Sequence, residues 1–582
     1  MLLAACASAS GRAACTIDRL AELPVTMDRM EPMIDVKING APVRMMADSG
    51  AFFSVISPGH AESLHLPLDP APFGFYVQGI NGTASVSIAT VKVFTLAGID
   101  LPRLPFIVGG SESRGAGVIG QNVFGIGDVE YDLPHGAIRL LRSKGCGKAN
   151  LAYWANGRSY SVVPIEPRSP QRPHTIATLH IDGKPIRATF DTGSSTSILS
   201  LAAAARIGIR PDSPGVVDGG VTYGIGRKLV QTWIAPIQNL TIGDGELIQH
   251  ARIRIAAMDV DTDMLIGADF FIAHRIYVDN ANHRLFLTYE GGPVFNIKAH
   301  YNDPDPRDTV AATQTVAAAT AASPPDAEAE SRAGAVAMAR RDADTAVADF
   351  TKAIALAPAE PRYLDQRAQA YLQQKRVALA RIDIDKAIAI KPDDVQARLI
   401  RATMLLHEHD RMAAAADLDA VDRSIDPAAM ERLMLADLII AVGQPQRAVG
   451  VLDQWIKAHP DDVRVPAALN SRCWARGLAG QDLDAALHDC DKALHARPGM
   501  AEILDSRGLV ELRRGDLAKA IADYDAVLAK HPGVAWSLYG RGVARLRSGD
   551  GNGARADFAA AEKAQPDIAE EAKRYGIVAA TS

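Results

Sequence analysis

The sequence predicts a multidomain protein in which two all-β lobes precede an all-α solenoid of helical repeats. Three observations lead to this fold class: a motif duplicated at an offset of 143 residues, prolines that recur at a nearly constant spacing, and a change of composition near residue 328. A chain of 582 residues is too long for one hydrophobic core, so several domains are expected. The net charge of -6 gives no reason to expect a nucleic acid or an anionic membrane as partner.

The N-terminal segment contains a candidate lipidation site at Cys6. The stretch LAAC that ends at Cys6 has the form of a bacterial lipoprotein cleavage box, in which small residues admit the peptidase and the thiol receives the lipid. The alternative is a chance cysteine in an alanine-rich terminus, since the basic region and the longer apolar stretch of a signal peptide are missing. Under the lipidation hypothesis we expect a protein of the bacterial cell envelope, periplasmic or lipid-anchored, with a truncated start site. The sequence contains no run of about 18 or more apolar residues, so we expect no membrane-spanning helix.

The strand-like region up to about residue 300 is an internal duplication. The segments INGAPVRMMADSG (38–50) and IDGKPIRATFDTG (181–193) each place an Asn-Gly or Asp-Gly turn before a strand that ends in an aspartate. A second pair of matching segments, 118–141 and 265–288, follows at an offset of 147 residues. Agreement at both ends predicts two lobes of the same fold.

The helical region contains repeats of about 34 residues. A small residue lies twelve positions before most of the recurring prolines and a larger one eight positions before several, which suits two closely packed helices. This pattern resembles the tetratricopeptide repeat, and the resemblance implies about seven helix-turn-helix units with a C-terminal capping helix. The recurring prolines are Pro358, Pro392, Pro427, Pro460, Pro498, Pro532 and Pro566.

Composition sets the remaining boundaries. Residues 303–327 are rich in Pro, Ala and Thr without apolar periodicity, which indicates a linker. The predicted divisions are an N-terminal signal remnant and lead-in (1–30), lobe 1 (31–142), a connection (143–158), lobe 2 (159–290), the linker (291–327) and the repeats (328–582).

Each lobe carries a short aspartate motif, Asp-Ser-Gly at 48–50 and Asp-Thr-Gly at 191–193. Together with the later Val-Ile-Gly (118–120) and Leu-Ile-Gly (265–267), these motifs resemble the active site of aspartic proteases, and the lobe size is closer to the retroviral-type (retropepsin-like) group. The resemblance implies a pseudo-dimer with one cleft, in which the motif glycines allow tight turns and the motif hydroxyls bind across to the opposite lobe. The implied site consists of the catalytic Asp48 and Asp191, supported by Ser49, Gly50, Thr192, Gly193 and Ser194.

Two such carboxyl groups suit hydrolysis by an activated water. Carboxylates held about 3 Å apart do not both ionise, so they share one proton. The ionised member takes a proton from water, which attacks the peptide carbonyl, while the protonated member polarises that carbonyl and later passes a proton to the leaving amine.

The two motifs differ at the next position, where Ser194 stands in lobe 2 and Ala51 in lobe 1. If the Ser194 hydroxyl reaches Asp191, it favours the ionised form of that carboxyl and leaves the shared proton on Asp48. We then expect Ser194→Ala to raise the lower apparent pKa of the pH–rate profile.

Each lobe also contains a glycine-rich hairpin between its aspartate motif and its apolar-glycine element, which is Val-Ile-Gly (118–120) in lobe 1 and Leu-Ile-Gly (265–267) in lobe 2. Such a hairpin either closes over substrate as a flap, excluding water and offering backbone hydrogen bonds to an extended peptide, or is an ordinary surface turn. Its occurrence in both lobes favours the flap. The candidate flap residues are Tyr76, Gly79, Gly82, Tyr223, Gly224 and Gly226.

Five cysteines are too few for a disulfide framework. Cys473 and Cys490 take facing positions on the two helices of one repeat, so a bond between them is sterically reasonable. The alternative is a pair of small buried thiols. A disulfide here would indicate an oxidising compartment, in line with the cell-envelope hypothesis.

The sequence therefore predicts an aspartic endopeptidase that hydrolyses extended protein segments and needs no cofactor or metal. We expect a monomer whose repeats bind a partner or substrate protein, with no nucleic-acid partner and membrane contact only through a lipid anchor. The alternative is a catalytically inactive peptide-binding adaptor that acts through the repeats. Self-processing in the linker is a third hypothesis.

Overall fold

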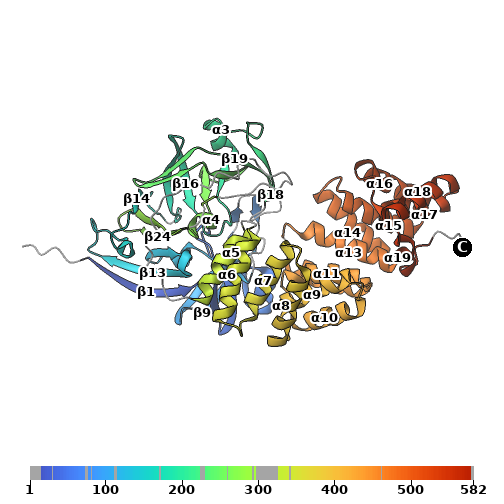
Figure 1. Cartoon of the computed structure of the whole chain (residues 1–582), viewed down its shortest axis with the longest axis horizontal. Coiled ribbons are helices and arrows are strands. Elements are labelled where there is room, and N and C mark those ends of the chain that lie inside the picture. The colour runs from blue at the N-terminus through green and yellow to red at the C-terminus, as the bar shows by residue number, and fades with distance from the viewer. Residues whose placement is uncertain are drawn as a thin grey trace, which may run out of the picture. The chain divides into compact units, whose positions relative to one another are not determined.

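The computed structural model describes residues 15–28, 30–72, 77–79, 82–84, 86–109, 115–169, 172–222, 230–258, 260–291, 294–295, 326–339, 342–460 and 462–578. It divides into two compact units, Met1–Ser57 with Leu64–Arg376 and Pro58–Ser63 with Val377–Ser582. The first unit holds the β-lobes and the helices α5 to α7, and the second holds the remaining repeat helices (Figure 1). No helix of the described residues is long and apolar enough to cross a membrane. The predicted order of a double β-lobe and helical repeats is confirmed.

Lobe 1 is a sheet with the strand order β2-β3-β4-β11-β5-β10-β9-β6. Its β3–β4 hairpin turns at Asn39 and Gly40, both with positive φ, as expected of a two-residue Asn-Gly turn. Strand β4 ends in three buried residues and pairs in parallel with β11, so the chain leaves β4 beside the apolar-glycine element. The strands are β2 (Thr26–Asp28), β3 (Glu31–Ile38), β4 (Ala41–Ala47), β5 (Val55–Ile56), β6 (Leu68–Pro70), β9 (Ser87–Leu96), β10 (Ile99–Val108) and β11 (Gly117–Ile119).

Lobe 2 repeats this arrangement in the order β18-β19-β22-β17-β23-β16-β15-β20-β21. Its β15–β16 hairpin turns at Asp182 and Gly183, again with positive φ, and β16 pairs in parallel with β23. The strands are β15 (Ile176–Ile181), β16 (Lys184–Phe190), β17 (Ile198–Ser200), β18 (Val217–Thr222), β19 (Val230–Pro236), β20 (Asn239–Ile242), β21 (Glu246–Gln249), β22 (Arg252–Ala256) and β23 (Met264–Ile266). The same turn and the same parallel pair thus bring each aspartate motif to the same place in its lobe.

A third sheet joins the two lobes in the order β1-β13-β12-β24-β25-β14. Its central pair is β12 of lobe 1 with β24 of lobe 2, which run antiparallel with Glu130 opposite Tyr277. The Trp154 indole donates a hydrogen bond of 2.7 Å to the Thr288 hydroxyl and links the inter-lobe connection to β25. The strands are β1 (Thr16–Pro24), β12 (Asp128–Asp132), β13 (Ala137–Lys144), β14 (Ser161–Pro164), β24 (His274–Asp279) and β25 (Arg284–Tyr289).

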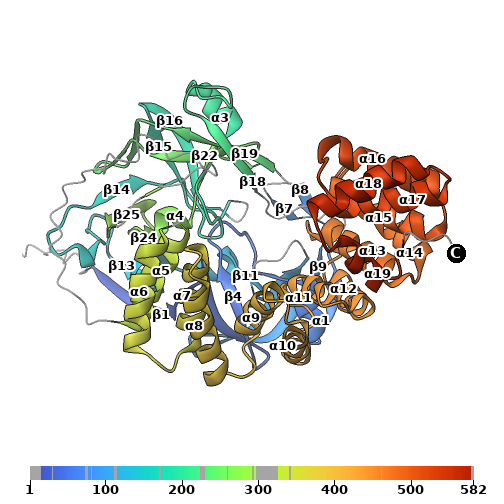
Figure 2. The same cartoon turned by 45° about the vertical axis from the view of Figure 1, so that its right-hand side comes forward.

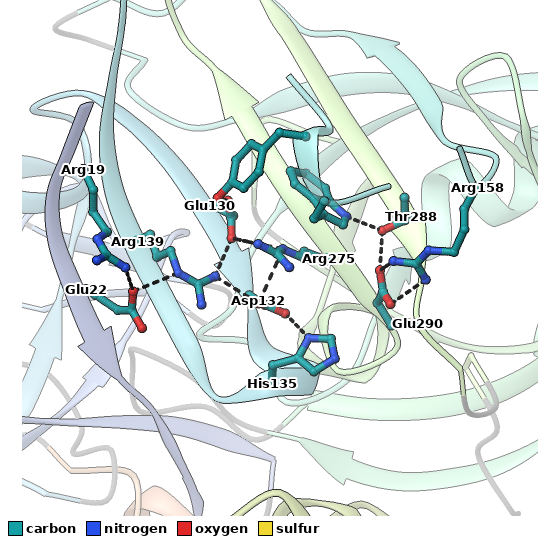
Figure 3. A network of polar contacts seen from close by, with 12 residues as sticks. Arg19, Glu22, Glu130, Asp132, His135, Arg139, Arg158, Arg275, Thr288 and Glu290 are labelled. Atoms are coloured by element: carbon teal, nitrogen blue, oxygen red, sulfur yellow. Dashed lines mark hydrogen bonds and ion pairs between the residues drawn. The ribbon is translucent and has the colours of Figure 1, made fainter. Parts of the chain in front are cut away.

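Buried ion pairs stabilise this shared sheet. Glu130 is fully buried and accepts hydrogen bonds from Arg139 of its own lobe, at 2.5 Å, and from Arg275 of the other lobe, at 2.7 Å. Asp132 also contacts both arginines, and Figure 3 shows the two carboxylates between the two guanidinium groups. Removing one partner of such a cluster leaves a buried charge, which typically costs about 3–5 kcal/mol. These pairs therefore hold the two lobes in one fixed arrangement.

The repeat helices pack as the spacing of small and large residues predicts. A Cβ atom at Gly508 would lie 2.9 Å from the ring of Tyr524, and one at Gly542 would lie 2.7 Å from the ring of Phe558. Glycine therefore lets each first helix approach the aromatic ring of the second helix, and the successive helices stack in pairs (Figure 2). The helices are α5 (Ala327–Ala339), α6 (Ala343–Leu356), α7 (Pro361–Gln373), α8 (Val377–Ile390), α9 (Val395–His407), α10 (Arg411–Ser424), α11 (Glu431–Ala441), α12 (Pro445–Ala458), α13 (Val465–Ala479), α14 (Leu483–Ala496), α15 (Ala501–Arg514), α16 (Leu517–Lys530), α17 (Ala535–Arg547), α18 (Gly551–Ala564) and α19 (Ile568–Arg574).

Arginines on the first helices connect neighbouring repeats. Arg507 forms two hydrogen bonds of 2.8 Å to Asp523 in its own repeat and one of 2.9 Å to Asp491 in the preceding repeat. Arg541 binds Asp557 and Asp525 in the same way, one repeat later. The planar guanidinium suits such forked contacts, so these arginines fix the stacking of one repeat on the next.

Candidate active site

The two motif aspartates meet at the ends of β4 and β16. The backbone N–H of Asp48 donates to the Ile119 carbonyl at 3.0 Å, and that of Asp191 donates to the Ile266 carbonyl at 2.8 Å. A Cβ atom at Gly50 would lie 2.3 Å from Cγ of Asp191, and one at Gly193 would lie 2.2 Å from Cγ of Asp48. Each carboxyl group therefore lies against the glycine of the opposite motif, where any side chain would clash with it.

Ser49 and Thr192 connect the two motifs by four buried hydrogen bonds. The Ser49 hydroxyl donates to the Phe190 carbonyl and accepts from the Thr192 N–H, both at 2.9 Å. The Thr192 hydroxyl donates to the Ala47 carbonyl at 2.7 Å and accepts from the Ser49 N–H at 3.0 Å. Because the bonds are reciprocal, they hold the two motifs at a fixed separation.

The environment of the carboxyl groups favours one shared proton. The N–H groups of Gly50 and Ala51 donate to Asp48 Oδ1 at 2.9 and 2.8 Å, and the N–H of Gly193 donates to Asp191 Oδ1 at 2.9 Å. Burial raises the pKa of both carboxyls, and the charge of Asp191 raises the pKa of Asp48 further. The hydrogen bond between the two carboxyls lowers the pKa of Asp191 while it raises that of Asp48. The two carboxyls therefore share one proton as a coupled pair, and their mutual hydrogen bond favours the ionised form at Asp191.

Comparison with protein families agrees with this geometry. The model of the family described as "Aspartyl protease" matches residues 34–123 and again 177–270, and the tetratricopeptide repeat model matches 331–395, 477–535 and 506–568. The chain carries the aspartyl protease domain twice, followed by tetratricopeptide repeats.

Comparison with solved structures finds repeat proteins of low identity. A tetratricopeptide repeat protein from Parabacteroides merdae is 18% identical, and the match covers 43% of this chain and 98% of that one, with a TM-score of 0.34. MamA is 21% identical over 29% of this chain and 96% of its own, with a TM-score of 0.23. YrrB, described as having an unusual peptide-binding site, is 16% identical over 39% of this chain and 97% of its own, with a TM-score of 0.21. The comparison with curated proteins gives no match.

In the second aspartyl protease domain, Ser194 differs from its expected role. Its hydroxyl donates to the Thr196 carbonyl at 2.8 Å instead of to Asp191. Ser194 binds the Asp191 carboxyl through its backbone N–H. The backbone N–H of Ala51 binds Asp48 in the same way. A serine in a tight turn readily bonds to a nearby backbone carbonyl, so the expectation about its hydroxyl was wrong. The difference between Ser194 and Ala51 therefore does not distinguish the two aspartates.

A polar pair behind each motif escaped the sequence analysis. In lobe 1, the N–H and the hydroxyl of Ser54 both donate to Asn122 Oδ1 at 2.8 Å. In lobe 2, the N–H and the hydroxyl of Ser197 donate to Asp269 Oδ1 at 2.8 and 2.7 Å, and burial raises the pKa of Asp269 to about 6. These residues brace the turn that follows each aspartate. The available signal was the polar residue found two positions after the Ile-Gly of both domains.

A second missed group links lobe 2 to the motif of lobe 1. Arg168 donates to Gln121 Oε1 at 2.5 Å, and Gln121 Nε2 in turn donates to the Ser49 carbonyl at 2.6 Å. The Tyr131 hydroxyl forms a hydrogen bond with Ser49 as well. No pattern in the sequence signals these contacts, because they join segments that are far apart along the chain.

The candidate flaps are described only in part. In lobe 1, Gly79 and Gly82 pair across an antiparallel hairpin of β7 (Val77–Gly79) and β8 (Gly82–Ala84). Tyr76 and the lobe 2 residues Tyr223, Gly224 and Gly226 lie outside the described residues. Their assignment as flaps stays a prediction.

The described residues contain two disulfides. Cys473 and Cys490 are joined with an S–S distance of 2.02 Å, between the facing helices α13 and α14. The second joins Cys15 to Cys146 and closes the far end of the β1–β13 pair. The sequence does not signal this bond, because its partners are 131 residues apart and no spacing rule relates them. Cys6 lies outside the described residues.

Proposed function

We propose that this protein is an aspartic endopeptidase that hydrolyses peptide bonds of extended protein segments. One observation carries the proposal: the carboxyls of Asp48 and Asp191 each lie against the glycine of the opposite motif, half-buried and with pKa values raised above the ordinary range. Placing two carboxyls side by side away from water is costly for folding, so such pairs are typical of catalytic sites that use them as acid and base.

Each carboxyl has a distinct role in the proposed reaction. Asp191, as the ionised member, accepts a proton from a water molecule, which then attacks the peptide carbonyl. Asp48, as the protonated member, donates a hydrogen bond to that carbonyl oxygen and stabilises the charge that develops on it. A proton then passes to the leaving amine, so the pair ends with one proton as it began.

The repeats and the disulfides support two further parts of the proposal. Tetratricopeptide repeats suggest protein or peptide binding, so we propose that they hold a partner or deliver the substrate protein. Two disulfides favour an oxidising compartment, which supports a location in the cell envelope. A single chain supplies both half-sites, so a monomer suffices for activity.

The test is cleavage of an unstructured protein by the purified full-length chain, over a range of pH values and with or without pepstatin. We expect pepstatin-sensitive cleavage that Asp48→Asn and Asp191→Asn each abolish, because either change removes the shared proton or its acceptor. Asp212→Asn, at an exposed position of the same domain, is the matched control and should cleave as the wild type does. Substantial cleavage by either dyad variant would rule out the dyad mechanism.

The same assay separates the remaining hypotheses. A folded wild-type protein that binds peptides and cleaves none over the whole pH range would favour the adaptor. Mass spectrometry of the incubated chain would show self-processing as a cut in the linker that is missing from Asp191→Asn.

A further inference from the structure

A segment of lobe 2 reaches the aspartate motif of lobe 1. Ahead of β15, Ser169 and Arg172 pair in an isolated β-bridge. His174 follows this bridge, and its imidazole donates a hydrogen bond to the carbonyl of Gly50. The same ring lies edge-on to the ring of Phe52, with 6.1 Å between the centroids. His174 thus contacts two of the four residues that follow Asp48.

Several charged groups face this imidazole. Asp191, at the end of β16, attracts its protonated form, and Asp261, in the loop before β23, does so more weakly. Arg168, from the segment that precedes the β-bridge, repels the protonated form. Burial and the charge of Asp191 raise the pKa of Asp48, which favours the neutral form of that carboxyl. Burial has the largest effect and lowers the pKa of His174 below 6.5, its ordinary value.

Among the groups that act on the two aspartates, an imidazole acts on Asp191 and not on Asp48. In the duplication, the position equivalent to His174 is Glu31 of lobe 1. His174 lowers the pKa of Asp191, whereas the groups that act on Asp48 are Asp191 and the backbone N–H groups of its own motif. A histidine beside one member of a carboxyl pair makes the two members unequal, because a cation favours the ionised form of its neighbour.

We propose that His174 is a positioning residue that keeps the negative charge of the dyad on Asp191 and extends the active pH range toward acid. Its hydrogen bond to Gly50 holds the motif of lobe 1 against that carboxylate, and its protonated form opposes a second protonation of the pair. The consequence for catalysis rests on the proposed endopeptidase function. The effect on the charge of Asp191 does not, because it is a property of the folded protein.

The first test is the pH–rate profile of two variants. His174→Gln keeps an N–H donor for Gly50 but takes no charge, and His174→Phe keeps only the ring packing. We expect both variants to raise the pKa of the acid limb by roughly one pH unit, which gives a loss of roughly tenfold in kcat/KM on the acid side. The basic limb should stay in place, because His174 is neutral there. His180→Gln, at an exposed position of β15, is the control.

A merely structural role for His174 would lower activity equally at all pH values, and that result would overturn the proposal. An acid limb that stays in place in both variants would overturn it as well.

The second test needs no activity. The chain has 15 histidines, and in protein labelled with ¹³C-histidine the signal lost in either His174 variant identifies this residue by NMR. We expect its titration midpoint to fall in Asp191→Asn, because the attracting carboxylate is gone, and to change less in Asp48→Asn. A midpoint that is the same in Asp191→Asn and in the wild type would overturn the proposal. If the wild type cleaves nothing, the endopeptidase function fails, and this titration still decides whether His174 acts on Asp191.

Discussion

The hydrogen bonds between the two motifs predict how strongly one hydroxyl stabilises the double β-lobe. Thr192→Val replaces a hydroxyl by a methyl group of similar size at a side chain that is 0% exposed. The change removes the donor to the Ala47 carbonyl, at 2.7 Å, and the acceptor of the Ser49 N–H, at 3.0 Å. Both backbone groups lie in the protein interior and have no access to water after the substitution.

The expected loss follows from those two groups. Leaving a buried donor or acceptor without a partner costs about 1–3 kcal/mol, so Thr192→Val should lower the free energy of unfolding by about 2–6 kcal/mol. For a unit of this size, such a loss corresponds to a decrease of roughly 3–10 °C in the melting temperature. Thr192→Ser keeps the hydroxyl and loses only a methyl group, so it should destabilise the protein much less.

Differential scanning calorimetry of the full-length chain measures the effect, because the β-lobes with α5 to α7 form one compact unit and the remaining repeat helices form another. Only the transition of the unit that holds the lobes should move. Ser49→Ala should cause a similar shift, and the double variant should lose less than the sum, because the two residues share one network. Two results would contradict this prediction: a Thr192→Val variant that melts as the wild type does, or a Thr192→Ser variant that loses as much stability as Thr192→Val. Either would mean that the hydrogen bonds between the two motifs do not stabilise the fold.

Two further changes test other parts of the structure. The folded protein keeps the proton of Asp269 up to about pH 6, whereas the unfolded chain releases it near the ordinary value of 3.8, so stability falls as the pH rises between these values. Asp269→Asn, which copies Asn122 of lobe 1, should therefore raise the free energy of unfolding at pH 7 by up to about 3 kcal/mol, seen as a higher melting temperature, and have little effect at pH 4. An equal gain at both pH values would contradict this. Cys473→Ser should cost the repeat unit about 3 kcal/mol, since the disulfide to Cys490 closes a loop across 17 residues, and reducing agent should then have no additional effect on that transition.

Local patterns were sufficient for much of the fold. The Asn-Gly and Asp-Gly turns predicted hairpins, and Asn39 and Asp182 do adopt the positive φ that such turns require. The small and large positions of the repeats predicted close helix pairs, and Gly508 does meet the ring of Tyr524. Each of these features depends on residues within one hairpin or one repeat, so the pattern and its structural cause lie in the same short segment.

Contacts between distant segments were not predictable in this way. The ion pair of Glu130 with Arg275 joins strands of different lobes, and the hydrogen bond of Arg168 to Gln121 joins the lead-in of one lobe to a helix of the other. Such contacts depend on how complete sheets pack, and a sequence read for spacing and periodicity does not contain that information.

The sequence by itself determined that two aspartates, Asp48 and Asp191, occupy equivalent places in two lobes, because duplication and turn chemistry are properties of short segments. The tertiary structure decided which groups act differently on the two carboxyls. The sequence attributed that difference to the hydroxyl of Ser194, yet that hydroxyl binds a backbone carbonyl, and the imidazole beside Asp191 comes from His174. The charge of a buried carboxyl depends on every group packed around it, and those groups come together only when the chain is folded.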